Sequence, residues 1–227
     1  DHYPPANPTI YISQTYSSRQ SVSGSLYFSN CLFRSITTSS DGGALYVSGS
    51  TLLIESTSFF SCTTSDTWGG AVCSYSGQSV LYKVCGYNCY STSNSNSWGQ
   101  FLHIRGNSTT LGKNFLNYSS FTRSLNDRSG ARYMLFYHGG KFGISQTNVS
   151  NNRCQLHSGI YYRPVADPNI VTCSFSFTTF ADNTANGYNC IMLNVAGTFY
   201  EIKCCNIIRN TQGSLNSEGT FTIYGNL

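Results

Sequence analysis

Glycine recurs along this chain at nearly one interval, and each recurrence is followed by a short apolar segment. The series consists of Gly43, Gly70, Gly99, Gly130, Gly159, Gly187 and Gly219. Its members are spaced at about 30 residues. Self-similarity at a period of about 20 to 50 residues indicates a stacked array in which no single unit buries its apolar face alone. The repeat therefore constrains the fold before any single residue is considered.

The segments after these glycines have the composition of β strands. Ala44 to Val47, Phe101 to Ile104 and Tyr133 to Tyr137 are rich in aromatic and branched side chains, which suit a pleated surface. A second strand-like set, including Leu52 to Ile54 and Val80 to Tyr82, is separated from the first by Gly49 and Gly77. We therefore expect two to three short strands in each repeat, which leaves no room for helices.

A parallel β-helix is the array that fits this pattern. Tyr and Phe outnumber the leucines that a leucine-rich repeat would need, and that repeat's asparagine turn is missing. Parallel crossovers within one sheet are right-handed in about 98% of cases. The sequence thus predicts an all-β, right-handed parallel β-helix of about seven to eight coils. Residues 1–25, with Pro4, Pro5 and Pro8, are expected to form a partial first coil or cap, and residues 26–227 the repeats.

Composition bounds the class of protein. A chain of 227 residues buries one substantial core and needs no second domain. Only 10% of the residues are charged and no hydrophobic run is long enough to span a bilayer, so we expect no membrane anchor in this chain. Its ten cysteines are an even count, which favours an oxidising compartment.

Two pairs of cysteines have nearly the spacing of one coil. They are Cys62 with Cys89, and Cys173 with Cys204. Both pairs are candidate disulfides if their side chains point the same way, and stacked free thiols are the equal alternative. No second cysteine pair stands at ligand spacing from Cys85 and Cys89, so we expect no metal site and no cofactor.

Three Asn-x-Ser/Thr sequons, at Asn107, Asn117 and Asn148, fall in expected turns or on outer strand faces. Together with the cysteines they favour an extracellular or cell-surface glycoprotein.

Two early coils contain Gly42-Gly43-Ala44-Leu45 and Gly69-Gly70-Ala71-Val72, and a later one contains Phe180-Ala181-Asp182-Asn183. These stretches resemble the repeat motifs of chlamydial polymorphic outer-membrane proteins. The chain is more similar to trichomonad surface proteins of the right-handed β-helix, polymorphic membrane protein-like type. That likeness runs from about Leu26 onward, through Asp41 to Tyr46, Lys83 to Cys89 and Asn206 to Gly219.

The resemblance implies surface display and adhesion and supplies no enzymatic residues to carry over. Members of that family typically continue into further coils and a membrane anchor. Whether this chain is a processed ectodomain, a section of a longer protein or a secreted member is left open by the resemblance.

Many β-helices cleave polysaccharides, which requires paired carboxylates or an acidic calcium cluster. The chain has nine acidic residues, and no two lie within ten positions of each other. Asp41 and Asp66 are the pair that stacking would most readily unite, although an Asp before Gly is more often a turn residue. His103, His138 and His157 have no nucleophile motif beside them. We therefore expect no enzyme.

Basic residues cluster in the middle of the chain, where eight of the thirteen lie between positions 105 and 163. Arg123 and Arg153 stand one coil length apart, as do Arg132 and Arg163, which would place like charges on one face. We expect a wall that binds an anionic ligand, formed by Arg105, Arg123, Arg132, Lys141, Arg153 and Arg163. The alternative is a solvated basic face that binds no ligand. Nucleic acid is not expected as a partner, because the net charge is only +4.

The sequence thus predicts a non-enzymatic extracellular β-helix with an adhesive or structural role. Its expected partners are a host or neighbouring cell surface, an anionic glycan, or copies of itself stacked end to end in a filament. The alternatives are a polysaccharide-cleaving β-helix and a glycan-binding module. A stacked aromatic ladder beside the basic coils would favour the glycan-binding module.

Overall fold

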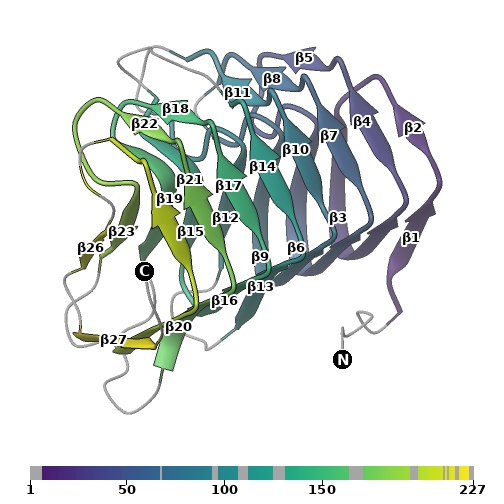
Figure 1. Ribbon diagram of the computed structural model, residues 1–227. Helices are drawn as coiled ribbons and strands as arrows, with labels where there is room; N and C mark the ends of the chain where they lie inside the picture. The colour runs from purple at the N-terminus through teal and green to yellow at the C-terminus, as the bar shows by residue number, and fades with distance from the viewer. Residues whose placement is uncertain are drawn as a thin grey trace.

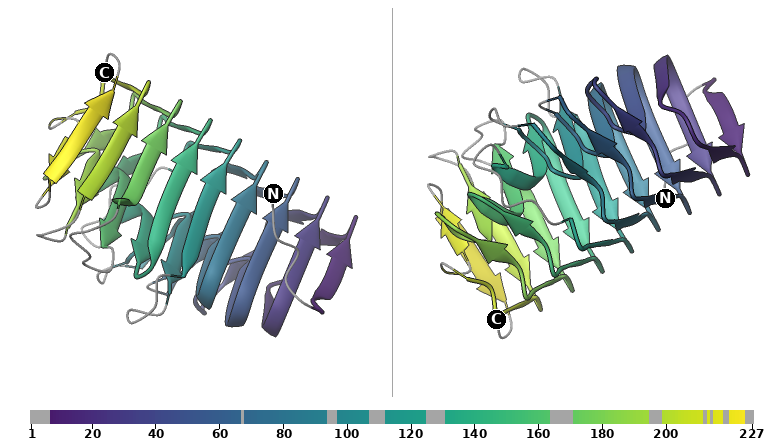
Figure 2. Two further views of the ribbon diagram at one scale, coloured as in Figure 1. Left: turned by 90° about the horizontal axis from the view of Figure 1, so that it is seen from below. Right: turned by 90° about the horizontal axis from the view of Figure 1, so that it is seen from above.

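The protein is a parallel β-helix. The computed structural model describes residues 7–66, 68–93, 97–106, 112–124, 131–163, 171–194, 199–211, 213, 215–217 and 220–224. Every element assigned in these ranges is a β strand. Successive coils follow one another along the stack in sequence order, from purple to yellow (Figure 1), and their strands run side by side in the same direction (Figure 2). Each coil therefore covers the apolar interior of the one before it.

The largest sheet, called the first wall here, has 14 strands. Its members are β1 (Thr9–Ile12), β3 (Gln20–Ser29), β6 (Leu45–Glu55), β9 (Val72–Tyr82), β12 (Leu102–Arg105), β13 (Lys113–Asn117), β15 (Tyr133–His138), β16 (Lys141–Ser145), β19 (His157–Arg163), β20 (Val171–Ser176), β23 (Ile191–Leu193), β24 (Phe199–Lys203), β26 (Leu215–Ser217) and β27 (Thr220–Tyr224). Strand β9 pairs with both β12 and β13, so the first wall forks there into two branches.

The second wall has eight strands. They are β2 (Thr15–Tyr16), β4 (Leu32–Arg34), β7 (Ser58–Phe60), β10 (Cys85–Tyr87), β14 (Ser120–Thr122), β17 (Asn148–Ser150), β21 (Thr179–Ala181) and β25 (Asn206–Ile208). The third side consists of two short sheets, β5 (Thr37–Thr38) with β8 (Thr63–Thr64) and β11 (Tyr90–Ser91), and β18 (Arg153–Cys154) with β22 (Thr184–Ala185).

Both corners that flank the second wall have the same construction. One residue has a positive φ, as at Ser56 (47°) before β7 and Ser61 (51°) after it. The next residue turns inward, and at most of these corners it is a Thr, Ser, Cys or Asn. At the first corner Thr147 accepts a hydrogen bond from Ser119 N–H in the preceding coil (3.3 Å) and donates to Ser145 O (2.9 Å). Such side chains satisfy the backbone groups that a corner leaves without strand partners.

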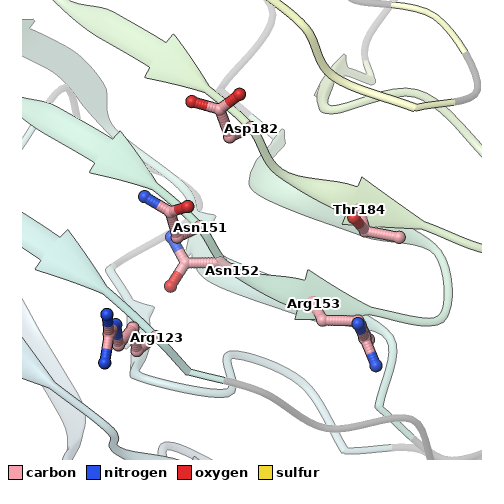
Figure 3. Close-up of a pocket in the computed structure, with 6 residues that line it drawn as sticks. All are labelled: Arg123, Asn151, Asn152, Arg153, Asp182 and Thr184. Atoms are coloured by element: carbon pink, nitrogen blue, oxygen red, sulfur yellow. The ribbon is translucent and has the colours of Figure 1, made fainter.

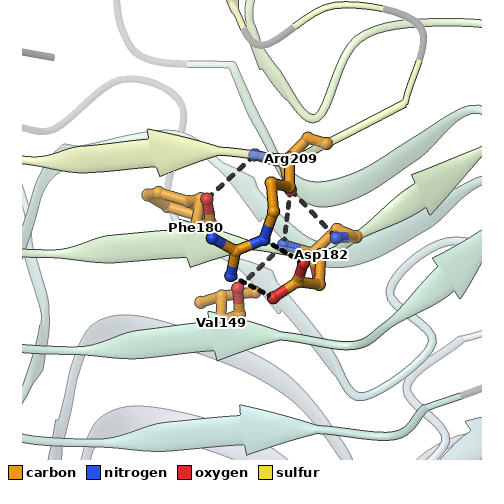
Figure 4. A network of polar contacts seen from close by, with 6 residues as sticks. Val149, Phe180, Asp182 and Arg209 are labelled. Carbon is orange, nitrogen blue, oxygen red and sulfur yellow. Dashed lines mark hydrogen bonds and ion pairs between the residues drawn. The ribbon is translucent and has the colours of Figure 1, made fainter.

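At the second corner the inward residues change along the stack. Cys62 and Cys89 are stacked early in the chain, and Asn152, Asn183 and Asn210 form a ladder later. Asn183 Oδ1 accepts from Asn152 N–H (3.1 Å), and Asn183 Nδ2 donates to Val149 O (2.8 Å) and Asn210 Oδ1 (3.0 Å). Just outside this ladder, Arg209 and Asp182 form a bidentate ion pair (Figure 4).

The interior is a column of apolar side chains in which aromatic rings lie over one another. Tyr16, Phe33 and Phe59 stack with centroid separations of 4.6 and 4.8 Å. Phe101 extends this internal stack with an edge contact to Phe59 (5.8 Å), and Phe121 with a tilted contact to Phe101 (4.7 Å). Phe33, Phe59, Phe101 and Phe121 are all at most 1% exposed. The core therefore runs along the axis of the stack.

The expected fold class is confirmed, and two details of the prediction are wrong. The stack is about six turns tall, against the seven to eight expected. The first coil, β1 and β2, has strands in only two walls, and the last pair, β26 and β27, has no second-wall strand among the described residues.

The second wrong detail concerns Gly49, which was expected to separate two strands. It lies inside the single long strand β6, and likewise Gly77 lies inside β9. A Cβ on Gly49 would lie 2.0 Å from the carbonyl oxygen of Gly24, so glycine there allows two backbones to approach closely rather than ending a strand. The separation expected from the sequence occurs only where the first wall forks, from β12 and β13 onward.

Candidate functional site

The outer face of one branch of the first wall carries three columns of side chains that run along the stack. Alternate residues of a strand point to opposite faces. Leu102 and Ile104 of β12 belong to the core, so His103 and Arg105 point outward. The strand register continues both positions into the next coils: His103 pairs with Phe136 and then Tyr161, and Arg105 with His138 and then Arg163.

The first column, called the external stack, is made of four rings. Trp68 lies on His103 (centroids 5.3 Å apart, planes 16° apart), His103 on Phe136 (4.7 Å, 19°) and Phe136 on Tyr161 (5.5 Å, 10°). His103 is 2% and Phe136 4% exposed, whereas Trp68 and Tyr161 are half-buried. The rings thus bury one another on the outside of the β-helix.

A second column of rings lies beside the external stack. Tyr133 stacks on His157 at 5.5 Å, and His157 on Tyr188 at 5.5 Å. Tyr133 also lies 4.4 Å from Tyr161, and Trp98 lies 5.2 Å from Phe136, both between centroids. These contacts join the two ring columns into one aromatic surface.

The third column, called the basic column, consists of Arg105, His138 and Arg163 on adjacent strands. Both arginines are exposed and His138 is half-buried. Neither arginine has an ion-pair partner among the residues that the structure describes. Burial lowers the pKa of His138 first, and the positive charges of Arg163 and Arg105 lower it further.

The ring columns and the basic column enclose a hollow of about 420 Å³. Its lining is Trp68, Trp98, His103, Arg105, Tyr133, Phe136, His138, Tyr161 and Arg163, with no carboxylate among them. The buried Nε1–H of Trp98 has no hydrogen-bond partner within the described part of the chain. The hollow therefore combines aromatic surface and positive charge.

A second hollow adjoins the first at Arg105, which lines both. Its volume is about 480 Å³, and Gly49, Gly77 and Gly106 form much of its lining beside Tyr75. The glycines have no side chains to fill the outer surface there. Together the two hollows extend over several coils, which suits an elongated ligand more than a compact one.

The histidines of this face are held neutral. Burial lowers the pKa of His103 to about 3, although its hydrogen bond to Trp98 O opposes the shift. Burial likewise lowers the pKa of His157 to about 4. Both therefore act as neutral rings near neutral pH, and neither has a nucleophile as a hydrogen-bond partner in the contacts above.

The six basic residues expected to form one anionic-ligand wall do not lie on one wall. Arg105 and Arg163 share the basic column, with His138 between them. Arg132 is not level with Arg163, as their spacing in the sequence suggested, because its neighbour Tyr133 pairs with His157. Lys141 begins strand β16 on the other branch, level with Lys113. The spacing did not predict the alignment because coils differ in length: Tyr133 pairs with His157, 24 positions on, whereas Cys85 pairs with Ser120, 35 positions on.

Arg123 and Arg153 line a separate hollow of about 290 Å³ with Asn151, Asn152, Asp182 and Thr184. Their side chains project in different directions (Figure 3). Several polar groups there already have structural partners: Arg123 bonds Tyr87 Oη at 3.1 Å, Asn152 belongs to the ladder, and Asp182 pairs with Arg209. This hollow is consequently a weaker candidate than the aromatic one.

Two of the three sequons can be placed. Asn117, in β13, and Asn148, in β17, are both half-buried and point away from the core. Asn117 Oδ1 accepts from Ser145 Oγ, and Asn148 Nδ2 donates to Ser150 Oγ. Asn107 lies outside the described residues.

All ten cysteines are free thiols in this structure. Cys62 and Cys89 do lie on neighbouring coils, with Cys62 N–H donating to Cys89 Sγ at 3.3 Å. The expectation that Cys173 and Cys204 are neighbours is wrong, because Cys173 pairs with Tyr200 and is buried, whereas Cys204 is an exposed corner residue.

The acidic residues that the structure describes do not gather on the aromatic face. Asp41 accepts a hydrogen bond from Trp68 N–H at 2.9 Å, which is a turn-stabilising role. Burial raises the pKa of Asp41, and the charge of Asp66 adds to that rise. Asp127 and Asp167 lie outside the described residues. Within the described ranges no three His, Cys, Asp or Glu side chains group closely enough to hold a metal ion, and no helix there could cross a membrane.

Comparison with known proteins gives no relative. No family model, curated protein or solved structure matches the chain. The site must therefore be interpreted from its own geometry.

Sequence reasoning missed most of the aromatic face. The sequence pattern did not single out five of its rings, Trp68, Trp98, Tyr133, Phe136 and Tyr161. It assigned no functional role to His103 and His138. One signal was present: Trp68-Gly69 and Trp98-Gly99 are the same dipeptide, one coil apart, immediately before two strands of the first wall. A repeated large aromatic residue at a coil boundary points to a stacked surface.

Proposed function

We propose that the protein is a non-enzymatic recognition module that binds an extended glycan across the external stack and the basic column, in an adhesive role at a cell surface or outside the cell. The hollow of about 420 Å³, lined by aromatic and basic side chains on a rigid sheet, carries this proposal. Sites of this kind are concave, mostly apolar and provided with a few polar groups. The adjoining glycine-lined hollow supports an elongated ligand such as an oligosaccharide.

Three further observations support this role over the cleavage of polysaccharide. A glycosidase needs two carboxyl groups about the substrate, and no carboxylate stands among the described residues that line either hollow. The histidines His103 and His157 are ring-stacking partners. The outward placement of Asn117 and Asn148 is compatible with a glycosylated, extracellular chain. Kinship with trichomonad surface proteins remains a prediction.

A glycan array probed with the purified protein tests the proposal. We expect binding to saccharides and at least a tenfold loss of affinity in Trp68→Ala, because this ring lines the hollow and truncation of an aromatic anchor in a binding site costs about 2 kcal/mol. The matched control is Phe60→Ala, because Phe60 also stacks on an aromatic ring outside the core, on Tyr87 at 5.0 Å, but on the second wall. Equal losses in both variants, or no binding at all, would contradict a site on this face.

The same saccharides decide whether the protein is an enzyme. Incubation with each bound oligosaccharide should leave its chain length unchanged, as measured by mass spectrometry. Shortened products that increase with protein concentration would instead establish the polysaccharide-cleaving alternative.

End-to-end assembly is the second candidate function. Among the described residues β1 pairs only with β3, and Ile10 and Ile12 of β1 are 54% and 53% exposed. An unpaired strand with apolar side chains favours pairing with another strand. Electron micrographs at high protein concentration should show filaments. Single, unassembled molecules in every micrograph would exclude end-to-end assembly.

A further inference from the structure

The basic column places positive charge at unusually close spacing. Neighbouring strands lie about 4.8 Å apart, so Arg105, His138 and Arg163 occupy three successive steps of one ladder. Like charges on neighbouring steps of such a ladder repel one another. The free protein reduces this repulsion by keeping His138 neutral, between two arginines that carry no ion-pair partner among the described residues.

The rings beside this column add to its positive character. Trp68, His103, Phe136 and Tyr161 lie nearly parallel, so their faces are occupied by one another. Stacking along the axis leaves ring edges directed toward the hollow. The edge of an aromatic ring is the positive part of its quadrupole. A neutral sugar seeks ring faces, whereas an anionic group is attracted both by ring edges and by guanidinium groups.

We propose that the basic column is the site for the carboxylate or sulfate group of an acidic saccharide, and that binding strengthens when His138 takes up a proton. This inference rests on the proposed function, because it assigns the charged part of the same ligand. A bound anion between Arg105 and Arg163 offsets the repulsion that disfavours the protonated form of His138. Anion binding and proton uptake therefore stabilise each other.

The sign of the pH dependence follows from the groups around His138. Arg105 on β12 and Arg163 on β19 face it from either side, and His103 on β12 is the nearest other titratable group. The arginines stay charged throughout, and His103, with a pKa of about 3, stays neutral above pH 4. Only His138 is left to gain charge as the pH falls below the ordinary histidine value of 6.5, because its own pKa is lowered from that value. Affinity for an anion should rise over that range.

The experiment uses pairs of oligosaccharides that differ only in charge. Uronate, sulfated and sialylated oligosaccharides are compared with their carboxyl-reduced or desulfated counterparts by isothermal titration calorimetry at constant ionic strength. We expect the acidic member of at least one pair to bind about tenfold more tightly at about pH 5.5, which is what one charge-assisted hydrogen bond contributes. Its affinity should fall as the pH rises, with net proton uptake measured in buffers of different ionisation enthalpy.

Variants separate the roles of the three residues. Arg105→Gln and Arg163→Gln should each lower affinity for the acidic member at least tenfold and leave the neutral member unaffected. His138→Gln should remove the pH dependence and the proton uptake. The matched controls are Arg153→Gln, an exposed arginine on the third side of the β-helix, and His157→Gln, a ring of the second column, which should both preserve the pH dependence.

Each remaining outcome has a definite meaning. Equal affinity for acidic and neutral members, lost in Trp68→Ala, would overturn the anion site and leave the proposed function intact. Binding by no saccharide of either kind would overturn both. Acidic preference with an unchanged pH dependence in His138→Gln would overturn the role of that histidine.

Discussion

Two stacks of aromatic rings in this molecule have the same origin and different surroundings. They are the internal stack, which includes Phe33, Phe59 and Phe121, and the external stack, from Trp68 to Tyr161. In both, aligned residues of successive coils lie one strand spacing apart, as Phe33 with Phe59 and Phe136 with Tyr161 do. Each stack also includes a ring from outside the aligned positions, Phe101 in the internal stack and Trp68 in the external one. Inside, the neighbours are aliphatic and the rings contribute stability. Outside, the neighbours are Arg105, His138 and Arg163, and the rings form one side of a hollow. The rings of the core and the rings of the proposed glycan site therefore differ in which face of the sheet they occupy, and not in their chemistry.

Truncating a ring of the internal stack should have the largest effect on stability. Phe59→Ala removes a side chain that is 1% exposed and stacked on Phe33, so we expect a loss of about 3 to 5 kcal/mol in the free energy of unfolding. Chemical denaturation measures it. Phe60→Ala, the next residue but 48% exposed, is the control, with a loss below about 1 kcal/mol. Similar losses of unfolding free energy in the two variants would contradict the view that only the internal rings contribute substantially to stability.

Acid should weaken the external stack specifically, because it contains a histidine and the internal stack contains none. Burial lowers the pKa of His103 from 6.5 to about 3, so below pH 6.5 the unfolded chain binds a proton that the folded chain does not. Stability should then fall with pH by up to about 1.4 kcal/mol per unit.

The decrease is to be measured by denaturation between about pH 7 and about pH 4.5. His103→Phe, which keeps a ring between Trp68 and Phe136, should reduce the decrease and leave the part contributed by buried His157, whose pKa is about 4. An unchanged slope in that variant would show that His103 is not the group responsible.

The asparagine ladder tests how far the internal column depends on polar contacts at its corner. Asn183→Ala leaves Asn152 N–H and Val149 O without their side-chain partners in a buried position. We expect a loss of about 2 kcal/mol in the free energy of unfolding. Asn186→Ala, at an exposed site in the following turn, should change stability by less than about 0.5 kcal/mol. An unchanged free energy of unfolding in Asn183→Ala would mean that backbone contacts alone stabilise the corner.

Thiol reactivity distinguishes inside from outside without changing stability. Cys85 and Cys204 are exposed and the other eight cysteines are buried. Native protein treated with iodoacetamide should gain two adducts, and denatured protein ten, by intact-mass measurement. Eight adducts in denatured, unreduced protein would instead indicate one disulfide, and peptide mapping would show whether it joins Cys62 and Cys89.

Much of the fold followed from local patterns. The glycine period and the strand-like segments predicted a parallel β-helix, because a repeat of this length without helices has few other ways to bury its apolar faces. The stacking of Cys62 on Cys89 also followed, since no insertion interrupts the coil between them. The corner asparagines were visible only in Phe180-Ala181-Asp182-Asn183, one copy of a pattern whose other copies are degenerate.

The sequence alone determined that coils would stack and that aligned residues would form ladders. Only the tertiary structure decided which residues are aligned. Aligned positions are 26 residues apart in one place and 35 in another, and a shift of one residue moves a side chain to the opposite face of its strand. Arg123 and Arg153 were therefore separated from Arg105 and Arg163, and His138 was placed between two arginines. The spacing of residues along the chain shows that the structure repeats. The length of each individual coil decides which residues align on neighbouring strands, and the basic column depends on that alignment.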